Sequence, residues 1–245
     1  MEQELNDNAD GNWKPLENNP EVINEYVSVL GFDATSFVFQ DIFSTEEWAQ
    51  DMIQKPCLGL MFIFPITEIS EKHRAEEKAK ILADGQKVDD DLFYMHQYAR
   101  NACGTVGVFH ILGNLPEAQR GLLIEGGKLD TFFKACQGKT YEERGNIFKG
   151  SKAVQESHAV AVEKGDSKQI EQEDEVDNHF ISFVNHNGSL YELDGRKAFP
   201  INHGPTSTET FLADACAAVQ QFMSRDAEQT NFGLIVLAAQ PAQDE

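Results

Sequence analysis

The stretch HFISFVNHNGSLYELDG, residues 179–195, constrains the fold of this chain more than any other part of the sequence. Two alternating apolar runs flank Asn187-Gly188, and this dipeptide is the strongest short-range signal for a two-residue hairpin turn. Such a turn fixes the register of its two strands, so Ile181 faces Asp194. His179 and Asp194 then become diagonal neighbours on one face, with Cα atoms roughly 7–8 Å apart. A ring N–H to carboxylate hydrogen bond can bridge that distance.

A histidine held in this way suits acid–base chemistry. The aspartate fixes the imidazole tautomer and leaves the second ring nitrogen free to exchange a proton. The alternative interpretation is an ion pair on a half-solvated face of the sheet. The opposite face carries Phe180, Val184, Tyr191 and Leu193 and is predicted to pack against the core.

Cys103 lies at the predicted start of an apolar helix, residues 104–114. Backbone N–H groups and the helix dipole at such a position favour thiolate over thiol. The alternative is a buried structural thiol, which is the usual place of a free cysteine. Gln97, six residues earlier, could turn its amide N–H toward the same point and stabilise an oxyanion, although an exposed glutamine would look the same.

Elsewhere, apolar periodicity and turn residues predict a mixture of helices and strands. Helices are predicted over 18–31, 71–85 and several stretches of 114–149, and strands over 36–43, 57–66 and 232–239. Ser44–Glu47 and Thr206–Glu209 are predicted capping boxes that each open a helix. The acidic stretch from about residue 150 to 177 is predicted to be a long mobile loop. One α/β or α+β domain is the expected class.

Composition excludes several kinds of function. A formal net charge of −21 repels nucleic acid and anionic membranes and attracts basic partners, with simple solubility as the alternative explanation. The longest apolar run, residues 57–66, is too short to span a bilayer. Residues 1–12 are predicted to be a disordered acidic leader rather than a targeting peptide. Four widely spaced cysteines indicate reduced thiols, so we expect the cytoplasm or the nucleus, and neither a metal nor a cofactor.

Two long motifs resemble the ubiquitin carboxyl-terminal hydrolases, a family of deubiquitinating cysteine proteases. FYMHQYARNACGTVG, residues 93–107, resembles their glutamine-plus-cysteine segment, and residues 177–204 resemble their histidine-plus-aspartate segment. The similarity extends from Trp13 to the FGLIVLAA run at 232–239, so it covers one catalytic domain, residues 13–245. It implies a papain-like α+β fold in α/β/α layers, with a mostly antiparallel sheet and a knotted backbone. The 150–177 stretch would be the crossover loop that arches over the active site.

The resemblance also implies a role for each motif residue. Cys103 would be the nucleophile, His179 the general base and acid, Asp194 the orienting carboxylate and Gln97 the oxyanion donor. Ubiquitin would be the substrate, cut after its last glycine to release small adducts or short peptide extensions, and the enzyme would be a monomer.

An acidic cleft would hold the arginines near the end of the ubiquitin tail. The acidic residues expected to contribute are Glu17, Glu171, Glu173, Asp174 and Glu175, although a charged loop is usually only solvated. Leu16, beside Glu17, is a further expected substrate contact. Three alternatives stay open at this point. The chain could bind or store ubiquitin with incidental hydrolysis, it could act on a ubiquitin-like modifier, or it could be another papain-like protease.

Overall fold

A computed structural model of the chain describes residues 13–163 and 178–240. Six strands form one sheet in the order β1-β6-β2-β3-β4-β5, and all neighbouring strands are antiparallel. The strands are β1 Phe37–Asp41, β2 Cys57–Pro65, β3 Asn178–His186, β4 Ser189–Leu193, β5 Ile201–Pro205 and β6 Gly233–Ala239. The two most apolar runs of the sequence, β2 and β6, lie side by side in the sheet because both of their faces are buried.

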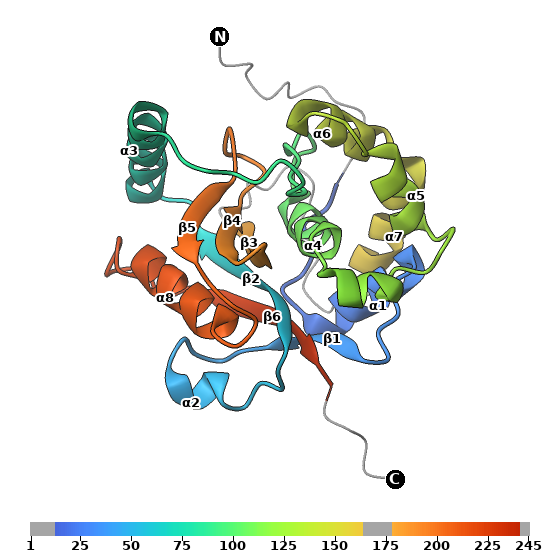
Figure 1. Ribbon diagram of the computed structural model, residues 1–245, viewed down its shortest axis with the longest axis horizontal. Coiled ribbons are helices and arrows are strands. Elements are labelled where there is room, and N and C mark those ends of the chain that lie inside the picture. Colours follow the sequence, from blue (N-terminus) through green and yellow to red (C-terminus); the bar gives the residue numbers. More distant parts are fainter. Residues whose placement is uncertain (1–12, 164–177, 241–245) are drawn as a thin grey trace.

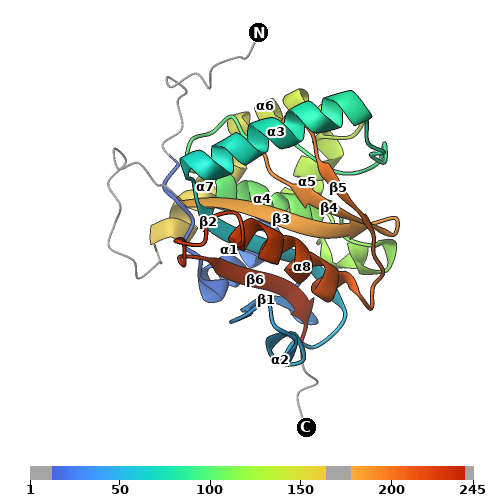
Figure 2. The same ribbon diagram turned by 90° about the vertical axis from the view of Figure 1, so that its left-hand side faces the viewer.

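Helices cover both faces of the sheet, as Figures 1 and 2 show. One hydrophobic core joins the sheet to α1, α4, α5, α6 and α7, and a second core joins it to α2 and α8. The helices are α1 Pro20–Leu30, α2 Glu47–Gln50, α3 Glu68–Asp84, α4 Cys103–Gly113, α5 Lys128–Ala135, α6 Tyr141–Gly150, α7 Lys152–Glu163 and α8 Phe211–Met223, with a 3₁₀ turn, η1, at Glu117–Leu122. The predicted α+β class and α/β/α layering are confirmed, and the knot stays a prediction.

The hairpin has the register that its turn predicts. Val184 pairs with Tyr191 and His186 with Ser189, and Asn187 and Gly188 both have positive φ angles. The interpretation of a half-solvated face is wrong, because His179 and Asp194 are only 2% and 3% exposed. A second helical layer over that face produces this burial, and nothing in the hairpin itself indicates it.

Part of the predicted 150–177 loop is helical. Residues 152–163 form α7, whose buried side chains Val154, His158 and Ala161 follow a helical spacing and pack beside α1. The acidic composition that suggested a loop belongs to residues further along, and residues 164–177 lie outside the described part of the chain.

Both predicted capping boxes are wrong in detail. The Ser44 hydroxyl accepts a hydrogen bond from Glu46 N–H, and α2 begins only at Glu47. At the second position, Thr206 donates to the Asp214 carboxylate and α8 begins at Phe211. Each side chain satisfies a different polar group near the helix start, so the sequence pattern places the helix a few residues too early.

Candidate active site

Cys103 is the first residue of α4. Asn101 has a φ of 61°, a left-handed conformation that asparagine tolerates, and it turns the chain sharply into the helix. The rest of α4 is almost entirely buried against β2 and β3, whereas Cys103 itself is partly exposed. The fold therefore places this thiol at a helix N-terminus.

His179 and Asp194 form the pair that the hairpin predicts. His179 Nε2 lies 2.7 Å from Asp194 Oδ1, and both side chains are almost fully buried. The other side of the imidazole meets the Cys103 thiol in a side-chain hydrogen bond. Phe64 of β2, opposite His179 in the sheet, packs edge-on against the ring at 5.9 Å between centroids. The imidazole is thus held between a carboxylate and a thiol.

The ionisation of these groups is coupled. Burial alone would raise the pKa of the Cys103 thiol, but the His179 imidazole and the N–H groups of Phe180 and Gly104 lower it below its usual 9.0. Burial likewise opposes a charge on His179, yet the Asp194 carboxylate and Cys103 raise its pKa to about 9. Both shifts favour a thiolate paired with an imidazolium at neutral pH.

The Asp194 carboxylate is kept ionised by the turn that follows it. Although burial opposes its charge, His179, Lys197 and the Arg196 backbone N–H hold its pKa far below the usual range. Arg196 N–H donates to Asp194 Oδ1 at 2.9 Å, the same oxygen that meets His179. The Tyr94 hydroxyl donates to Asp194 O at 2.5 Å and to Lys197 O at 2.6 Å, so it joins the two ends of the turn that contains Asp194.

Lys197 and Tyr94 are functional candidates that the sequence analysis missed. Lys197 is buried, and its ammonium group lies 2.5 Å from the carboxylates of both Glu77 and Glu192. A lysine two residues after a glycine looks like an exposed surface residue, so only the fold shows its role. Tyr94 lies within the resembling motif, but no local pattern distinguishes its hydroxyl.

The role of Gln97 as oxyanion donor stays a prediction, and its side-chain amide is hydrogen-bonded within its own segment. Its backbone N–H donates to Gly195 O at 2.8 Å, which ties it to the residue after Asp194. Its side-chain Nε2 donates to Ala99 O at 3.1 Å, and its Oε1 is buried without a hydrogen-bond partner among the described residues. The amide nitrogen carries a second N–H, which makes no hydrogen bond with the described residues.

Of the expected substrate contacts, only Leu16 and Glu17 fall within the described residues. The Leu16 side chain is 2% exposed and packs against Gly104 at the start of α4, and its contact with substrate stays a prediction. Glu17 is partly buried, and its Oε2 has no hydrogen-bond partner among residues 13–163 and 178–240. The remaining four, Glu171, Glu173, Asp174 and Glu175, lie in the part of the chain that is not described.

The other three cysteines contrast with Cys103. All three are buried, and burial raises the pKa of Cys57 and Cys136 to about 11 and that of Cys216 to about 12. They are structural thiols, as predicted from their apolar surroundings.

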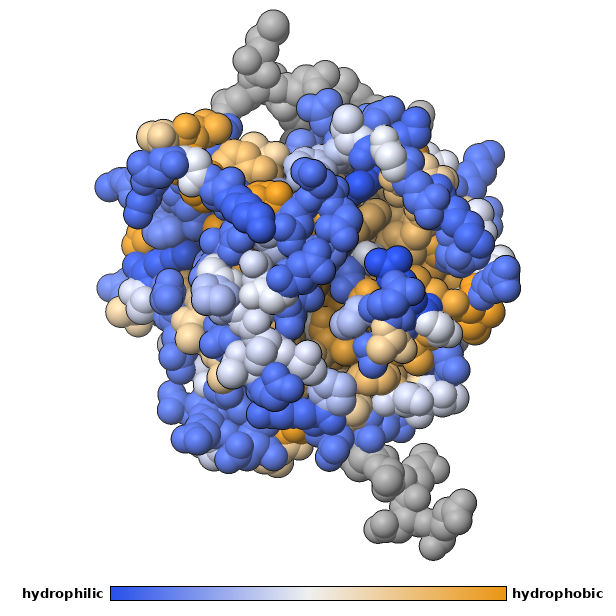
Figure 3. All heavy atoms as spheres, in the orientation of Figure 1, coloured by the Kyte–Doolittle hydropathy of each residue, from blue (hydrophilic) through white to orange (hydrophobic). Residues whose placement is uncertain are grey.

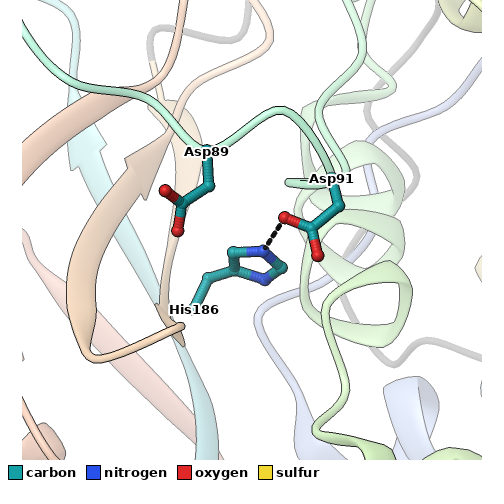
Figure 4. Close-up of side chains that lie close together, drawn as sticks. All are labelled: Asp89, Asp91 and His186. Carbon is teal, nitrogen blue, oxygen red and sulfur yellow. Dashed lines mark hydrogen bonds and ion pairs between the residues drawn. The ribbon is translucent and has the colours of Figure 1, made fainter.

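A second cluster of ionisable groups lies at the tip of the hairpin. Asp89, Asp91 and His186 bring carboxylate and imidazole atoms within 4.8 Å of one another, and a hydrogen bond of 2.9 Å joins His186 Nε2 to Asp91 (Figure 4). This donor set could in principle hold a cation, although Asp91 is 69% exposed and already paired with His186. We interpret it as a polar contact that holds the tip of the hairpin against the segment that follows α3.

A sheet and a helix that aim a partly exposed cysteine at a carboxylate-held imidazole form the arrangement of a cysteine hydrolase. The sequence matches the family described as ubiquitin carboxyl-terminal hydrolase, family 1, over residues 13–224. The chain belongs to this family. No helix of residues 13–163 and 178–240 is long and apolar enough to cross a membrane.

Relatives in distant organisms agree with this assignment. A ubiquitin carboxyl-terminal hydrolase of Drosophila melanogaster is 38% identical over 227 residues, 93% of this chain and 97% of the relative. The human isozyme L1 is 34% identical over 225 residues, 91% and 97% of the two chains. The fold resembles that of the Trichinella spiralis UCH37 catalytic domain bound to ubiquitin vinyl methyl ester, with a TM-score of 0.74, 20% identity, and coverage of 97% and 100%.

Proposed function

We propose that this chain is a cysteine-type deubiquitinase that hydrolyses the bond after the last glycine of ubiquitin. The observation that carries the proposal is the thiol–imidazole–carboxylate chain of Cys103, His179 and Asp194, with the pKa values of the thiol and the imidazole shifted toward each other. Family membership supplies the substrate class, because the relatives are ubiquitin carboxyl-terminal hydrolases.

In the first step the Cys103 thiolate attacks the carbonyl carbon of that glycine. The tetrahedral intermediate collapses when the His179 imidazolium gives its proton to the departing amine, which leaves a thioester on Cys103. The neutral imidazole then takes a proton from water, and the hydroxide attacks the thioester. Ubiquitin leaves with a free carboxylate, and the proton that His179 took returns the site to the thiolate–imidazolium pair.

The oxyanion of the intermediate would be stabilised by the Cys103 N–H and the Gln97 amide. The Cys103 N–H belongs to the first turn of α4, so it has no acceptor within the helix. Gln97 would donate the second N–H of its side-chain amide to the oxyanion. An interaction made only in the transition state accelerates chemistry without tightening ground-state binding.

Glu17 would receive a cationic side chain of the ubiquitin tail. A carboxylate oxygen that is buried without a hydrogen-bond partner among the described residues is costly, and a guanidinium would satisfy it. The −21 net charge of the chain would further speed the approach of a basic tail.

The leaving group would be small. A segment that spans the active site, as expected for the family, would limit what leaves on the far side, so short or unfolded extensions should be cut faster than folded proteins. Ubiquitin fused to a short tagged peptide and ubiquitin fused to a stable folded domain provide the comparison. Equal kcat/KM for the two fusions would refute a size filter.

Turnover and labelling together test the central proposal. Wild-type enzyme should hydrolyse a fluorogenic ubiquitin amide and form a covalent adduct with ubiquitin that carries a C-terminal electrophile. Cys103→Ala should abolish both while retaining ubiquitin binding, and Cys216→Ala, which removes a buried thiol, should preserve both. Binding without turnover in the wild type would refute the enzymatic function, and labelling of Cys103→Ala would refute the choice of nucleophile.

A further inference from the structure

A cavity of about 690 Å³ lies at the opposite end of α4 from Cys103. Its walls come from the end of α4, the α5–α6 connection, η1 and the segment around residues 90–93, and none of the four proposed catalytic residues lines it. The volume falls within the range of roughly 300–1,000 Å³ that is typical of small-molecule sites.

The floor of the cavity is apolar. It is formed by Phe93, Leu112, Leu115, Phe133 and Cys136, most of which are buried in the main core. In the space-filling view, hydrophilic side chains cover most of this face, and apolar side chains come to the surface in the hollowed region between α4 and α5 (Figure 3).

Four cations line the walls, which is unusual for a chain with a net charge of −21. Three of them already have carboxylate partners: Arg120 with Glu117 at 3.1 Å, Lys134 with Asp130 at 2.8 Å and Lys139 with Glu143 at 3.4 Å. The fourth, Arg144, makes no ion pair with any of the described residues.

Arg144 is partly buried against the floor of the cavity. Its Nη1 donates to the carbonyl oxygens of Leu92 and Tyr94 at 3.2 Å each, and its guanidinium carbon lies 5.1 Å from the Phe93 ring centroid. Its Nε is buried without a hydrogen-bond partner among the described residues. Burial lowers the pKa of this guanidinium, because no carboxylate compensates its charge. The side chain thus has unused donors beside an apolar surface.

We propose that this cavity binds a small apolar group that carries one carboxylate. The carboxylate would accept hydrogen bonds from the unused guanidinium edge of Arg144, and the apolar group would cover Phe93 and Phe133. Asp90 and Asp91, which also line the cavity, would repel a dianion, so a phosphate monoester is a poorer fit than a carboxylate. The proposal does not depend on the catalytic assignment, because the cavity shares no residue with it.

Three ligands with the same apolar group and different heads test the proposal: 4-phenylbutanoate, 4-phenyl-1-butanol and 4-phenylbutylamine. Titration of the ¹⁵N-labelled full chain should shift amide signals of residues 112–115 and 133–139. We expect the carboxylate to bind at least tenfold more tightly than the alcohol, and the ammonium least. Equal affinity for acid and alcohol, shifts centred on residues 101–105, or no shifts with 5 mM acid would each overturn the proposal.

Two variants separate binding from folding. Arg144→Lys keeps the charge but loses the planar fork, and should weaken the acid at least tenfold. Gln137 is an exposed residue of the cavity wall, so Gln137→Trp should place a ring over the cavity opening and block binding of the acid while leaving Arg144 unchanged. Lys80→Gln, on the exposed helix α3, should bind the acid like wild type. Unchanged affinity in both Arg144→Lys and Gln137→Trp would refute this location.

The same carboxylate chemistry occurs in free acids and at peptide C-termini. An acetylated tripeptide ending in phenylalanine, compared with its C-terminal amide and with 4-phenylbutanoate, identifies the source. Tighter binding of the peptide acid than of 4-phenylbutanoate indicates a polypeptide terminus, and the reverse order indicates a small acid. Equal affinity of the peptide acid and its amide would count against recognition by Arg144.

Discussion

Replacing Asp194 with asparagine should remove the charge that keeps His179 protonated. The pKa of His179 is about 9, against 6.5 for an unperturbed imidazole, although burial opposes the charge. A rise of this size corresponds to about 3.5 kcal/mol at ~1.4 kcal/mol per pKa unit, and Asp194 contributes more to it than Cys103 does. Without the carboxylate, the pKa should fall below 6.5, so the protonated fraction at pH 7.5 drops from about 97% to less than about 10%.

The assay is kcat/KM for a fluorogenic ubiquitin amide between pH 5 and 10. Wild type should give a bell-shaped profile whose alkaline limb falls near pH 9, where His179 loses its proton, and whose acid limb reports Cys103. Asp194→Asn should move the alkaline limb below pH 7 and lower the maximum about 100- to 1,000-fold, because the imidazole also loses its fixed orientation.

A matched control involves the other histidine of the same hairpin, His186. Asp91 also accepts a hydrogen bond from a histidine, His186, but at the exposed tip, so Asp91→Asn should leave the profile unchanged. If Asp194→Asn lowers the rate but keeps its alkaline limb near pH 9, the reasoning about His179 is wrong.

Three further predictions follow from the same contacts. Tyr94→Phe should lower kcat about tenfold with little change in KM. It should also destabilise the fold by about 1–2 kcal/mol, because two buried carbonyl oxygens lose their hydrogen-bond donor. Steady-state kinetics and urea unfolding measure the two effects, and an unchanged kcat would show that Tyr94 does not position Asp194. Glu17→Gln should lower kcat/KM about tenfold and flatten its dependence on salt, whereas a salt dependence equal to wild type would contradict a contact with a cationic tail. His110 and His158 are buried and neutral, with pKa values lowered to about 4, so the stability they provide above pH 6.5 is lost as pH falls toward 4. Between pH 4 and 6.5, the free energy of unfolding should rise less steeply with pH in His158→Gln than in wild type, by about 1.4 kcal/mol per pH unit, as measured by urea unfolding. Equal slopes in the two proteins would mean that His158 is already protonated in the folded chain.

The sequence predicts the local parts of the site because short-range chemistry determines them. The Asn187-Gly188 turn sets the register that brings His179 to Asp194, and the apolar run after Cys103 indicates a helix that starts there. The meeting of Cys103 with His179 depends on α4 packing against β3, which no local pattern encodes. For this step the prediction rested on the family resemblance.

Residues that support the site were harder to predict. Lys197 is buried only because Glu77 of α3 and Glu192 of β4 converge on it, and those two residues are 115 positions apart in the sequence. The sequence does not show which way the Leu16 side chain points. The structure places it beneath α4, where it supports the nucleophile through packing.

The two hairpin histidines, each paired with an aspartate, show what a sequence motif leaves undetermined. Their hydrogen bonds are similar, 2.7 Å for His179 with Asp194 and 2.9 Å for His186 with Asp91. The first pair is buried, with 3% and 4% of its side chains exposed, whereas Asp91 of the second is 69% exposed. The same charge separation gives a several-fold stronger interaction where water is excluded than at the surface. Only the pair at the covered end of the sheet can therefore hold an imidazolium against a thiolate, so the helices that cover the sheet, as much as the catalytic side chains, make this site reactive.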